Sequence, residues 1–548
     1  MGANQSSLKI GEYLIKRLSD YGAGHVFGVP GDYVLSFFHL LESSSLQIVN
    51  TCDEQGAGFA ADAYARLKGL GVVAVTYCVG GLKLANTTAE AFAEKSPVVV
   101  ISGAPGTDER AKNPLLHHRV RDFDTQFKVF QELTVASAVL DHPETAFREI
   151  DRVLAACVRQ KRPVYLELPR DMVLSPGLSE RTTPEEEAAS DPEVLEEALS
   201  EALEMIARAR KPVMIAGIEI HRFGLHDELL RLLDKTRIPV ASTLLSKSVI
   251  SERHPLYLGV YEGAMGREDV REYVETSDCL ILLGAPMSDV DLGVFTARLD
   301  PSVSISIKSD KASIRFHNFE GIRLGDFIHG LIQSDLKARD PGKIPNPKEP
   351  LWFIPVPNTA ITIERLFQRL NAFLDNDTVV IADPGDAMLS GGDLFIHGST
   401  EFICPAYYTS MGFAVPASLG AQLARPGLRP LVLVGDGAFQ MTGLELSTIA
   451  RYKLNPVVVV LNNRGYGTER PMLDGAFNDV GLWRYSKIPE LIGAGRGFDI
   501  ETEAQLDDAL RIVREAPGEF SILDVHLDPN DRSQASKRLT SSLAKRVR

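Results

Sequence analysis

The sequence predicts an α/β protein with three doubly wound, mainly parallel-sheet domains. Short apolar runs rich in valine and isoleucine alternate with helical patterns along the whole chain. Such runs are typical of strands buried on both faces of a parallel sheet. The length of 548 residues exceeds what one core holds, and at roughly 100–200 residues per domain three domains are expected. Two segments without apolar periodicity divide the chain into three blocks.

The first block, residues 1–181, carries five predicted strands separated by helical patterns. The strand sequences are HVFGVP, LQIVNT, GVVAVTY, PVVVISG and PVYLELP. The acidic segment TTPEEEAASD at 182–191 has the composition of a linker. We therefore expect an N-terminal domain that ends at residue 181.

The second block, residues 192–335, repeats the alternation. Its amphipathic helix is EVLEEALSEALEMIARAR, and its strands are PVMIAGIEI, PVASTLLS, CLILLGAPM and VSISIK. The glycine spacing in AGIEIHRFG does not match a dinucleotide-binding loop, so we expect a structural or regulatory middle domain. The proline-rich segment 336–358 excludes a helix and predicts a second extended linker.

The third block, residues 359–548, carries the strands TVVIADPG, PLVLVGDG, PVVVVLNN and FSILDVHL. Its polar tail from residue 528, which ends with basic residues, is compatible with a helix packed loosely on the surface or with a frayed end.

Composition narrows the class of partner and the location. A formal charge of −15 opposes general attraction to nucleic acid and to anionic lipid, so we expect neither partner and favour a small-molecule substrate. Five cysteines without C-x-x-C spacing suggest reduced thiols rather than a zinc site or a disulfide framework. No apolar run approaches the length of a membrane span or follows a basic leader, so we expect a cytoplasmic protein.

The most specific motif is Gly435-Asp436-Gly437, which directly follows the apolar run LVLV. A second pair, Asn462-Asn463, directly follows the apolar run VVVVL. The carboxyl ends of parallel strands meet at one edge of a sheet, where ligands bind. A carboxylate and an amide oxygen at neighbouring strand ends can coordinate Mg²⁺, and glycines allow a phosphate group to approach the backbone.

This pairing resembles the thiamine diphosphate fingerprint, and the whole chain is similar to the pyruvate, indolepyruvate and branched-chain 2-keto acid decarboxylase family. The resemblance implies thiamine diphosphate and Mg²⁺ as cofactors. It implies that Asp436, Asn463 and the backbone carbonyl of Gly465 bind the metal. The implied cofactor-binding residues are Glu54, Asp386, Thr409, Met411, Gly435, Asp436, Gly437, Ala438 and Asn463.

Three of these residues have specific implied roles. Glu54, in VNTCDEQGAGFAADAYAR, matches the glutamate that hydrogen-bonds the aminopyrimidine ring and so promotes loss of the thiazolium C2 proton. Met411, in TSMGFAVPASLG, matches the apolar residue that forces the bent cofactor shape, which is catalysis by positioning. The backbone carbonyl of Thr409 is expected to accept a hydrogen bond from the 4′-amino group.

The resemblance implies a proton relay of Asp32, His117, His118 and Glu469. They occur in FGVPGDYVL, NPLLHHRV and NNRGYGTER. The adjacent histidines separate simple decarboxylases from carboligating relatives. After carbon dioxide leaves, the reaction needs proton donors that work near neutral pH. Glu469 is the candidate to meet the substrate carboxylate.

The substrate pocket departs from that of pyruvate-specialised members. Met388 and Leu389 stand where those members carry large aromatic rings, which predicts a larger, adaptable pocket for longer, branched or aromatic 2-keto acids. Asp383, Pro384 and Arg464 also depart from the family pattern, and the sequence assigns them no role.

The resemblance also implies a homodimer or homotetramer with active sites at the subunit interface. Two alternatives stay open at this point. One is a carboligase of the acetolactate synthase type, which the histidine pair and Glu469 disfavour. The other is a catalytically silent cofactor-binding homologue.

Overall fold

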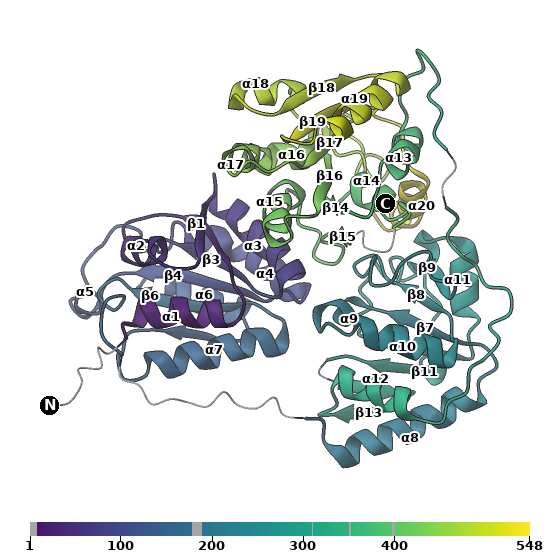
Figure 1. Ribbon diagram of the computed structural model, residues 1–548, viewed down its shortest axis with the longest axis horizontal. Helices are drawn as coiled ribbons and strands as arrows, with labels where there is room; N and C mark the ends of the chain where they lie inside the picture. The colour runs from purple at the N-terminus through teal and green to yellow at the C-terminus, as the bar shows by residue number, and fades with distance from the viewer. Residues whose placement is uncertain (1–7, 178–188, 310, 350–351, 397–400, 548) are drawn as a thin grey trace. The chain divides into compact units, whose positions relative to one another are not determined.

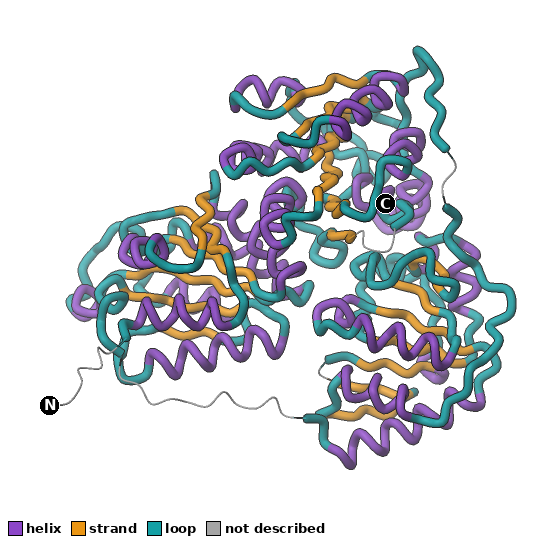
Figure 2. The backbone as a smooth tube through the Cα atoms, in the orientation of Figure 1, coloured by secondary structure: helices purple, strands orange, loops and turns teal. Residues whose placement is uncertain are grey.

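The computed structural model describes residues 8–177, 189–309, 311–349, 352–396 and 401–547. Most of the predicted first linker, 182–191, lies outside these residues. Three separate sheets are present, each with helices on its faces (Figures 1 and 2). Nearly all strand pairs are parallel, which confirms the predicted fold class.

The first sheet has six parallel strands in the order β2-β1-β3-β4-β6-β5. All five predicted strands are present, and β5 is additional. The strands are β1 (His25–Val29), β2 (Gln47–Asn50), β3 (Gly71–Val75), β4 (Val98–Ala104), β5 (Ser137–Val139) and β6 (Val164–Pro169). The helices are α1 (Ile10–Asp20), α2 (Leu35–Glu42), α3 (Glu54–Lys68), η1 (Gly81–Leu84), α4 (Ala85–Ala93), α5 (Thr107–Ala111), α6 (Thr125–Leu133) and α7 (Ala146–Gln160). Apolar residues of α1, α2 and α7 form one core with alternate residues of the strands.

The second sheet has seven strands in the order β13-β12-β11-β10-β7-β8-β9, and an antiparallel hairpin, β12–β13, forms one edge. The strands are β7 (Pro212–Ala216), β8 (Val240–Ser242), β9 (Tyr257–Val260), β10 (Cys279–Leu283), β11 (Ser304–Ile307), β12 (Lys311–Ile314) and β13 (His317–Glu320). The helices are α8 (Pro192–Arg208), α9 (Ile218–Arg222), α10 (His226–Thr236), η2 (Gly263–Met265), α11 (Glu268–Glu275), η3 (Pro301–Val303) and α12 (Leu324–Gln333). The predicted amphipathic helix is α8, which begins after the N-cap Asp191 with a proline in its first turn.

The third sheet has six parallel strands in the order β15-β14-β16-β17-β19-β18. The strands are β14 (Thr378–Ala382), β15 (Glu401–Ile403), β16 (Arg429–Gly435), β17 (Val457–Asn462), β18 (Arg496–Ile500) and β19 (Ser521–His526). The helices are α13 (Ile363–Asn371), α14 (Asp386–Gly391), α15 (Ala414–Ala424), α16 (Asp436–Thr442), η4 (Gly443–Glu445), α17 (Leu446–Arg451), η5 (Ala476–Asn478), η6 (Tyr485–Lys487), α18 (Ile488–Ile492), α19 (Glu503–Glu515) and α20 (Gln534–Val547).

The first and third sheets share one strand order. In each, the first strand in the chain lies between the second and the third. The chain therefore reverses its direction of progress across the sheet at β1/β3 and again at β14/β16. In open α/β sheets, ligands bind outside the carboxyl ends of the strands at such a switch point.

The described residues form two compact units. The first contains the residues up to 177 together with Gly412–Leu428 and Thr442–Leu454, so α15 and α17 join the N-terminal sheet. Within it, Phe59 on α3 makes an edge-to-face contact with Phe413 at the start of α15. The second unit contains the remaining described residues. The boundaries 1–181, 192–335 and 359–548 stay a prediction.

A buried ionic cluster lies between α3 and α4 of the first unit. The Arg66 guanidinium contacts the carboxylates of Asp62 at 2.7 Å and Glu94 at 2.9 Å. A third acid, Glu90, is also fully buried, and its carboxyl lies 3.7 Å from Arg66 without a hydrogen-bond partner among the described residues. Burial, with the charges of Asp62 and Glu94, raises the pKa of Glu90 well above its usual range.

No described helix has the length and apolarity needed to cross a membrane.

We expect Glu90→Gln to stabilise the protein at about pH 8, by about 1–3 kcal/mol, because it removes a buried acid that has no hydrogen-bond partner among the described residues and lies beside the acids Asp62 and Glu94. The folded state binds the Glu90 proton more tightly than the unfolded state, so the contribution of Glu90 to the stability of the wild type falls as pH rises above about 4.3. The gain should therefore shrink towards about pH 5. Thermal unfolding at both pH values measures it.

The matched control is Glu94→Gln, which breaks the 2.9 Å ion pair with Arg66 and should lower the melting temperature. A Glu90→Gln protein that melts below wild type at the higher pH would contradict this account.

Candidate active site

A cavity of about 500 Å³ opens in the second unit at the carboxyl ends of β14, β16 and β17. It lies at the switch point between β14 and β16, as expected for an open α/β sheet. Every cofactor, metal and pocket residue that the sequence predicted in the C-terminal block lines it, as does Glu469. These residues are Asp386, Met388, Leu389, Thr409, Met411, Gly435, Asp436, Gly437, Ala438, Asn463, Gly465 and Glu469.

Asp436 is the buried carboxylate at the end of β16. One carboxylate oxygen accepts a hydrogen bond from the Gly437 N–H at 2.8 Å, and the other accepts from the Gly465 N–H at 3.0 Å. Burial raises the pKa of Asp436 to about 6, although these backbone N–H groups oppose the shift. A cation at this carboxylate would offset the cost of its burial.

Asn463 and Gly465 bring further oxygen atoms to the same strand ends. Asn463 is buried, and the Gly465 carbonyl accepts one hydrogen bond, from Gly467 N–H at 2.9 Å, which leaves a second lone pair. Only glycine suits position 465, because its φ is +153° and a Cβ there would lie 2.1 Å from the Asn478 carbonyl oxygen. A carboxylate, an amide and a carbonyl form a donor set that fits Mg²⁺.

Asp386 provides a second buried carboxyl beside the cavity. One of its oxygens accepts from the Ser533 hydroxyl at 3.4 Å. The other is buried without a hydrogen-bond partner among the described residues. Burial raises the pKa of Asp386. A buried polar atom left unpartnered at a cavity indicates that a polar ligand group completes its bonding.

Thr409 has a strained backbone where it lines the cavity. Its φ is +57°, which is a conformational outlier for a β-branched residue. The strain is held by a hydrogen bond from its N–H to the Pro405 carbonyl at 2.9 Å. Such strain concentrates at functional sites because the surrounding structure must enforce it. Met411, two residues on, lines the same cavity.

Apolar side chains form much of the remaining wall of the cavity. Met388 and Leu389 lie on α14 and are almost fully buried. Met472 and Leu539 also line the cavity, as does Met265 from the middle block. The sequence had not predicted these three. Met265 and Met472 belong to no recognised motif, and the tail that carries Leu539 could equally have frayed. Instead the tail forms α20, and Ala535 packs with Met265 and Leu389 in one apolar cluster.

Asp32, His117 and His118 come together in the first unit. His117 Nε2 lies 2.8 Å from an Asp32 carboxylate oxygen, and the two imidazole rings are 4.7 Å apart. Tyr33 stacks on His117 and donates its hydroxyl to the His117 carbonyl at 3.4 Å. His118 has a φ of +66°, another strained non-glycine residue. Glu469, the fourth predicted relay member, belongs to the second unit.

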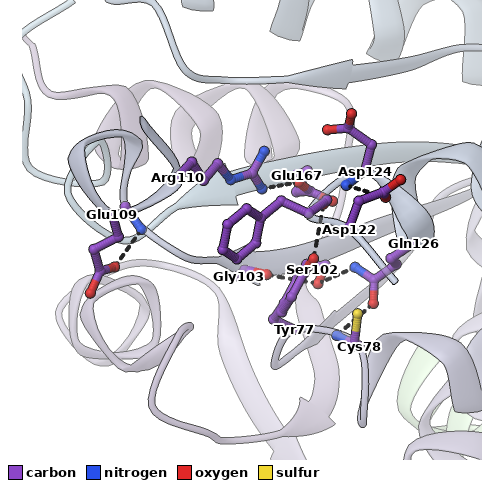
Figure 3. Close-up of polar contacts among 12 residues, drawn as sticks. Tyr77, Cys78, Ser102, Gly103, Glu109, Arg110, Asp122, Asp124, Gln126 and Glu167 are labelled. Atoms are coloured by element: carbon purple, nitrogen blue, oxygen red, sulfur yellow. Dashed lines mark hydrogen bonds and ion pairs between the residues drawn. The ribbon is translucent and has the colours of Figure 1, made fainter. Parts of the chain in front are cut away.

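A buried polar network supports the loops around these residues (Figure 3). The Gln126 amide donates to Ser102 at 2.8 Å and accepts from the Cys78 N–H at 2.7 Å. Tyr77 donates its hydroxyl to the Phe123 carbonyl at 2.8 Å. Phe123 lies near the end of the loop that carries His117 and His118. Satisfied buried networks of this kind hold a unique local geometry.

A buried ion pair extends this network. Arg110 pairs with the fully buried Glu167, and Tyr165 donates to Glu167 at 2.8 Å. Since Gln126 also bonds the Tyr165 hydroxyl at 2.5 Å, the ion pair and the loop-anchoring amide form one connected chain.

Glu54 is the first residue of α3, directly after the N-cap Asp53. The Glu445 carboxylate accepts from the N–H groups of Cys52 and Asp53, at 3.0 and 3.1 Å. The Lys83 ammonium lies 2.7 Å from Glu54 Oε2. Sequence reasoning missed both Glu445 and Lys83, because neither stands near Glu54 in the chain and neither belongs to a recognised motif.

Comparison with known families gives three consecutive matches. Residues 8–127 match the thiamine pyrophosphate enzyme N-terminal TPP binding domain, and residues 199–323 match the central domain of these enzymes. Residues 390–525 match the C-terminal TPP binding domain.

Similar proteins match along nearly the whole chain. An indole-3-pyruvate decarboxylase of Azospirillum brasilense is 37% identical over 528 residues, covering 94% of this chain and 95% of its own. Alpha-keto-acid decarboxylases of Mycobacterium avium (strain 104) and Mycobacterium tuberculosis (strain ATCC 25618 / H37Rv) are 34% and 33% identical. These alignments cover 96% and 98% of this chain, and 95% and 97% of the relatives.

If Asn463 is a Mg²⁺ ligand, Gly467→Ala should weaken Mg²⁺ binding. A Cβ at position 467 would lie 2.4 Å from Asn463 Nδ2, so the Asn463 amide must move. We expect a loss of roughly tenfold or more in Mg²⁺ affinity, measured by titration calorimetry with thiamine diphosphate present. The control is Gly427→Ala, whose Cβ would meet nothing within 4 Å. Wild-type affinity in Gly467→Ala would argue against Asn463 as a ligand.

Proposed function

Because the chain belongs to the thiamine-diphosphate-dependent 2-keto acid decarboxylase family and is therefore a carboxy-lyase, we propose that it converts longer, branched or aromatic 2-keto acids to aldehydes and carbon dioxide, with Mg²⁺ as its metal. The observation that carries this proposal is one cavity lined both by the buried acids Asp386 and Asp436 and by the apolar side chains of Met388 and Leu389. An apolar wall suits a large side chain, and loss of carbon dioxide disperses charge.

The proposed metal ligands are Asp436, Asn463 and the Gly465 carbonyl. Their burial and donor types fit a hard cation that retains few protein ligands and binds phosphate oxygens as well. The glycines at 435 and 437 allow close approach of the diphosphate. Ala438 offers only its backbone N–H, and Asp386 lies beside this region. When bound, thiamine diphosphate supplies the acceptor for the electron pair released with carbon dioxide.

Glu54, Thr409 and Met411 are proposed to orient the organic part of the cofactor. The Glu54 carboxyl would hydrogen-bond the aminopyrimidine ring nitrogen, and the Thr409 carbonyl would accept a hydrogen bond from the 4′-amino group. Met411 would supply an apolar contact that favours the bent form of the cofactor. The strained Thr409 backbone supports its role, because a fixed carbonyl direction is what such an acceptor needs.

Asp32, His117, His118 and Glu469 are proposed to move protons. The 2.8 Å contact between His117 and Asp32 orients the imidazole and balances its charge when it is protonated. Glu469 meets the substrate carboxylate and assists its departure.

The proposed assembly is a homodimer or homotetramer, in which Glu54 of one subunit meets Asp436 of another. Exposed apolar side chains in the second unit support an interface there: Phe477, Leu482 and Trp483 are 66%, 78% and 43% exposed. Apolar surface of this kind favours burial against a partner. A cytoplasmic location stays a prediction.

The first test is product formation by the purified protein with thiamine diphosphate and Mg²⁺. The substrates are pyruvate, 2-ketoisovalerate, a longer linear 2-keto acid, phenylpyruvate and indolepyruvate. We expect aldehyde and carbon dioxide, with kcat/KM higher for the larger acids than for pyruvate. Preference for pyruvate would refute the open pocket. Acetolactate without free aldehyde would identify a carboligase, and bound cofactor without product would identify a silent homologue.

We expect Glu54→Gln to lose nearly all turnover while it keeps its fold, because the amide cannot exchange a proton with the ring nitrogen. Asp436→Ala should lose cofactor and metal together, as measured by cofactor and Mg²⁺ content after gel filtration. Mixing the two inactive variants under subunit exchange should restore part of the activity if each site draws on two subunits. Full turnover by Glu54→Gln would refute the assignment of that residue.

A further inference from the structure

Lys83 holds the side chain of Glu54. Its ammonium lies 2.7 Å from Glu54 Oε2 and also pairs with the Asp53 carboxylate. The Asp53 and Glu54 carboxylates raise the pKa of Lys83 against the opposing effect of partial burial, so the lysine stays charged at neutral pH. One ammonium therefore joins the N-cap of α3 to the first residue of that helix.

The segment that carries Lys83 is itself fixed. It follows β3 at the switch point of the first sheet. Gln126 accepts from the Cys78 N–H at 2.7 Å and packs directly against Gly81, and Leu82 N–H donates to the Cys78 carbonyl at 2.8 Å. The buried network of Gln126 thus positions the short helix η1, which presents Lys83. Although the Lys83 side chain is long and half-exposed, its backbone is therefore held in place.

Glu54 is constrained from three directions within the first unit. Glu445 fixes the backbone of the preceding turn through Cys52 and Asp53. Gly80 packs next to Glu54 Oε1, since a Cβ at position 80 would lie 3.2 Å from that oxygen. Lys83 takes Oε2. The charged groups that bond this turn include the acids Asp53 and Glu445 and the ammonium of Lys83.

We propose that Lys83 is a positioning residue that fixes the Glu54 carboxyl, so that Oε1 meets the aminopyrimidine ring nitrogen of the cofactor. This inference rests on the proposed function of Glu54. The half-exposed Lys83 gives a weak ion pair in energetic terms. Its effect is geometric: it selects one orientation of a carboxyl whose alignment decides the rate of proton transfer.

The test compares Lys83→Met with the conservative Lys83→Arg and with Lys16→Met. Lys16 is an apt control because it forms a similar exposed ion pair, at 2.7 Å from Asp20, on α1 of the same unit. The readout is the rate of hydrogen–deuterium exchange at C2 of thiamine diphosphate bound with Mg²⁺, followed by NMR after acid quench without substrate. Cofactor affinity is measured in parallel.

We expect Lys83→Met to slow C2 exchange by roughly tenfold to a hundredfold at saturating cofactor. Lys83→Arg should recover most of the rate, and Lys16→Met should match wild type. Exchange in Lys83→Met equal to or faster than wild type, while Glu54→Gln is slow, would overturn the role of Lys83 alone. Fast exchange in Glu54→Gln, or no cofactor binding by wild type, would instead overturn the proposed function.

Discussion

The structure depends on burying carboxylates at the carboxyl ends of parallel strands. Asp436 is nearly inaccessible to solvent, and backbone N–H groups bond both of its oxygens. A buried charge is costly unless it is hydrogen-bonded and balanced. The N–H groups of Gly437 and Gly465 meet part of this cost, and the Asn463 amide and the Gly465 carbonyl add further polar atoms at the same strand ends. The Mg²⁺ that we propose would offset the free-energy cost of burying the Asp436 carboxylate.

At the first sheet, the charge of carboxylates near the strand ends is balanced by a side chain of the protein. The strand order of this sheet is the same as that of the third sheet, and its switch-point loops carry Asp32 and Lys83. There the ammonium of Lys83 balances the carboxylates of Asp53 and Glu54. The two sheets share one topology but carry different groups at their strand ends. The third sheet carries oxygen donors, and the first carries the acid Glu54, held by Lys83, and a histidine pair. Fold and chemistry are connected because both depend on where strands end.

The features that could be predicted from the sequence are those that depend on residues close together in the chain. The long apolar runs predicted every inner strand of the first and third sheets, and all inner strands of the second sheet except the short β12. The glycines beside Asp436 predicted residues that line the cavity. Short β5 and β15, three residues each, carry too little pattern. The grouping of α15 and α17 with the first sheet depends on tertiary packing. So does Glu445, which bonds Cys52 across 393 positions, and Leu539, whose place in the cavity wall depends on how the tail folds back.

The most direct test is a crystal structure with thiamine diphosphate and Mg²⁺ bound. We expect metal density coordinated by Asp436, Asn463 and the Gly465 carbonyl, with the diphosphate beside Gly435 and Gly437. We also expect the aminopyrimidine ring nitrogen to bond Glu54 of a second subunit. Cofactor bound elsewhere, or a metal that does not contact Asp436, would contradict the proposed site.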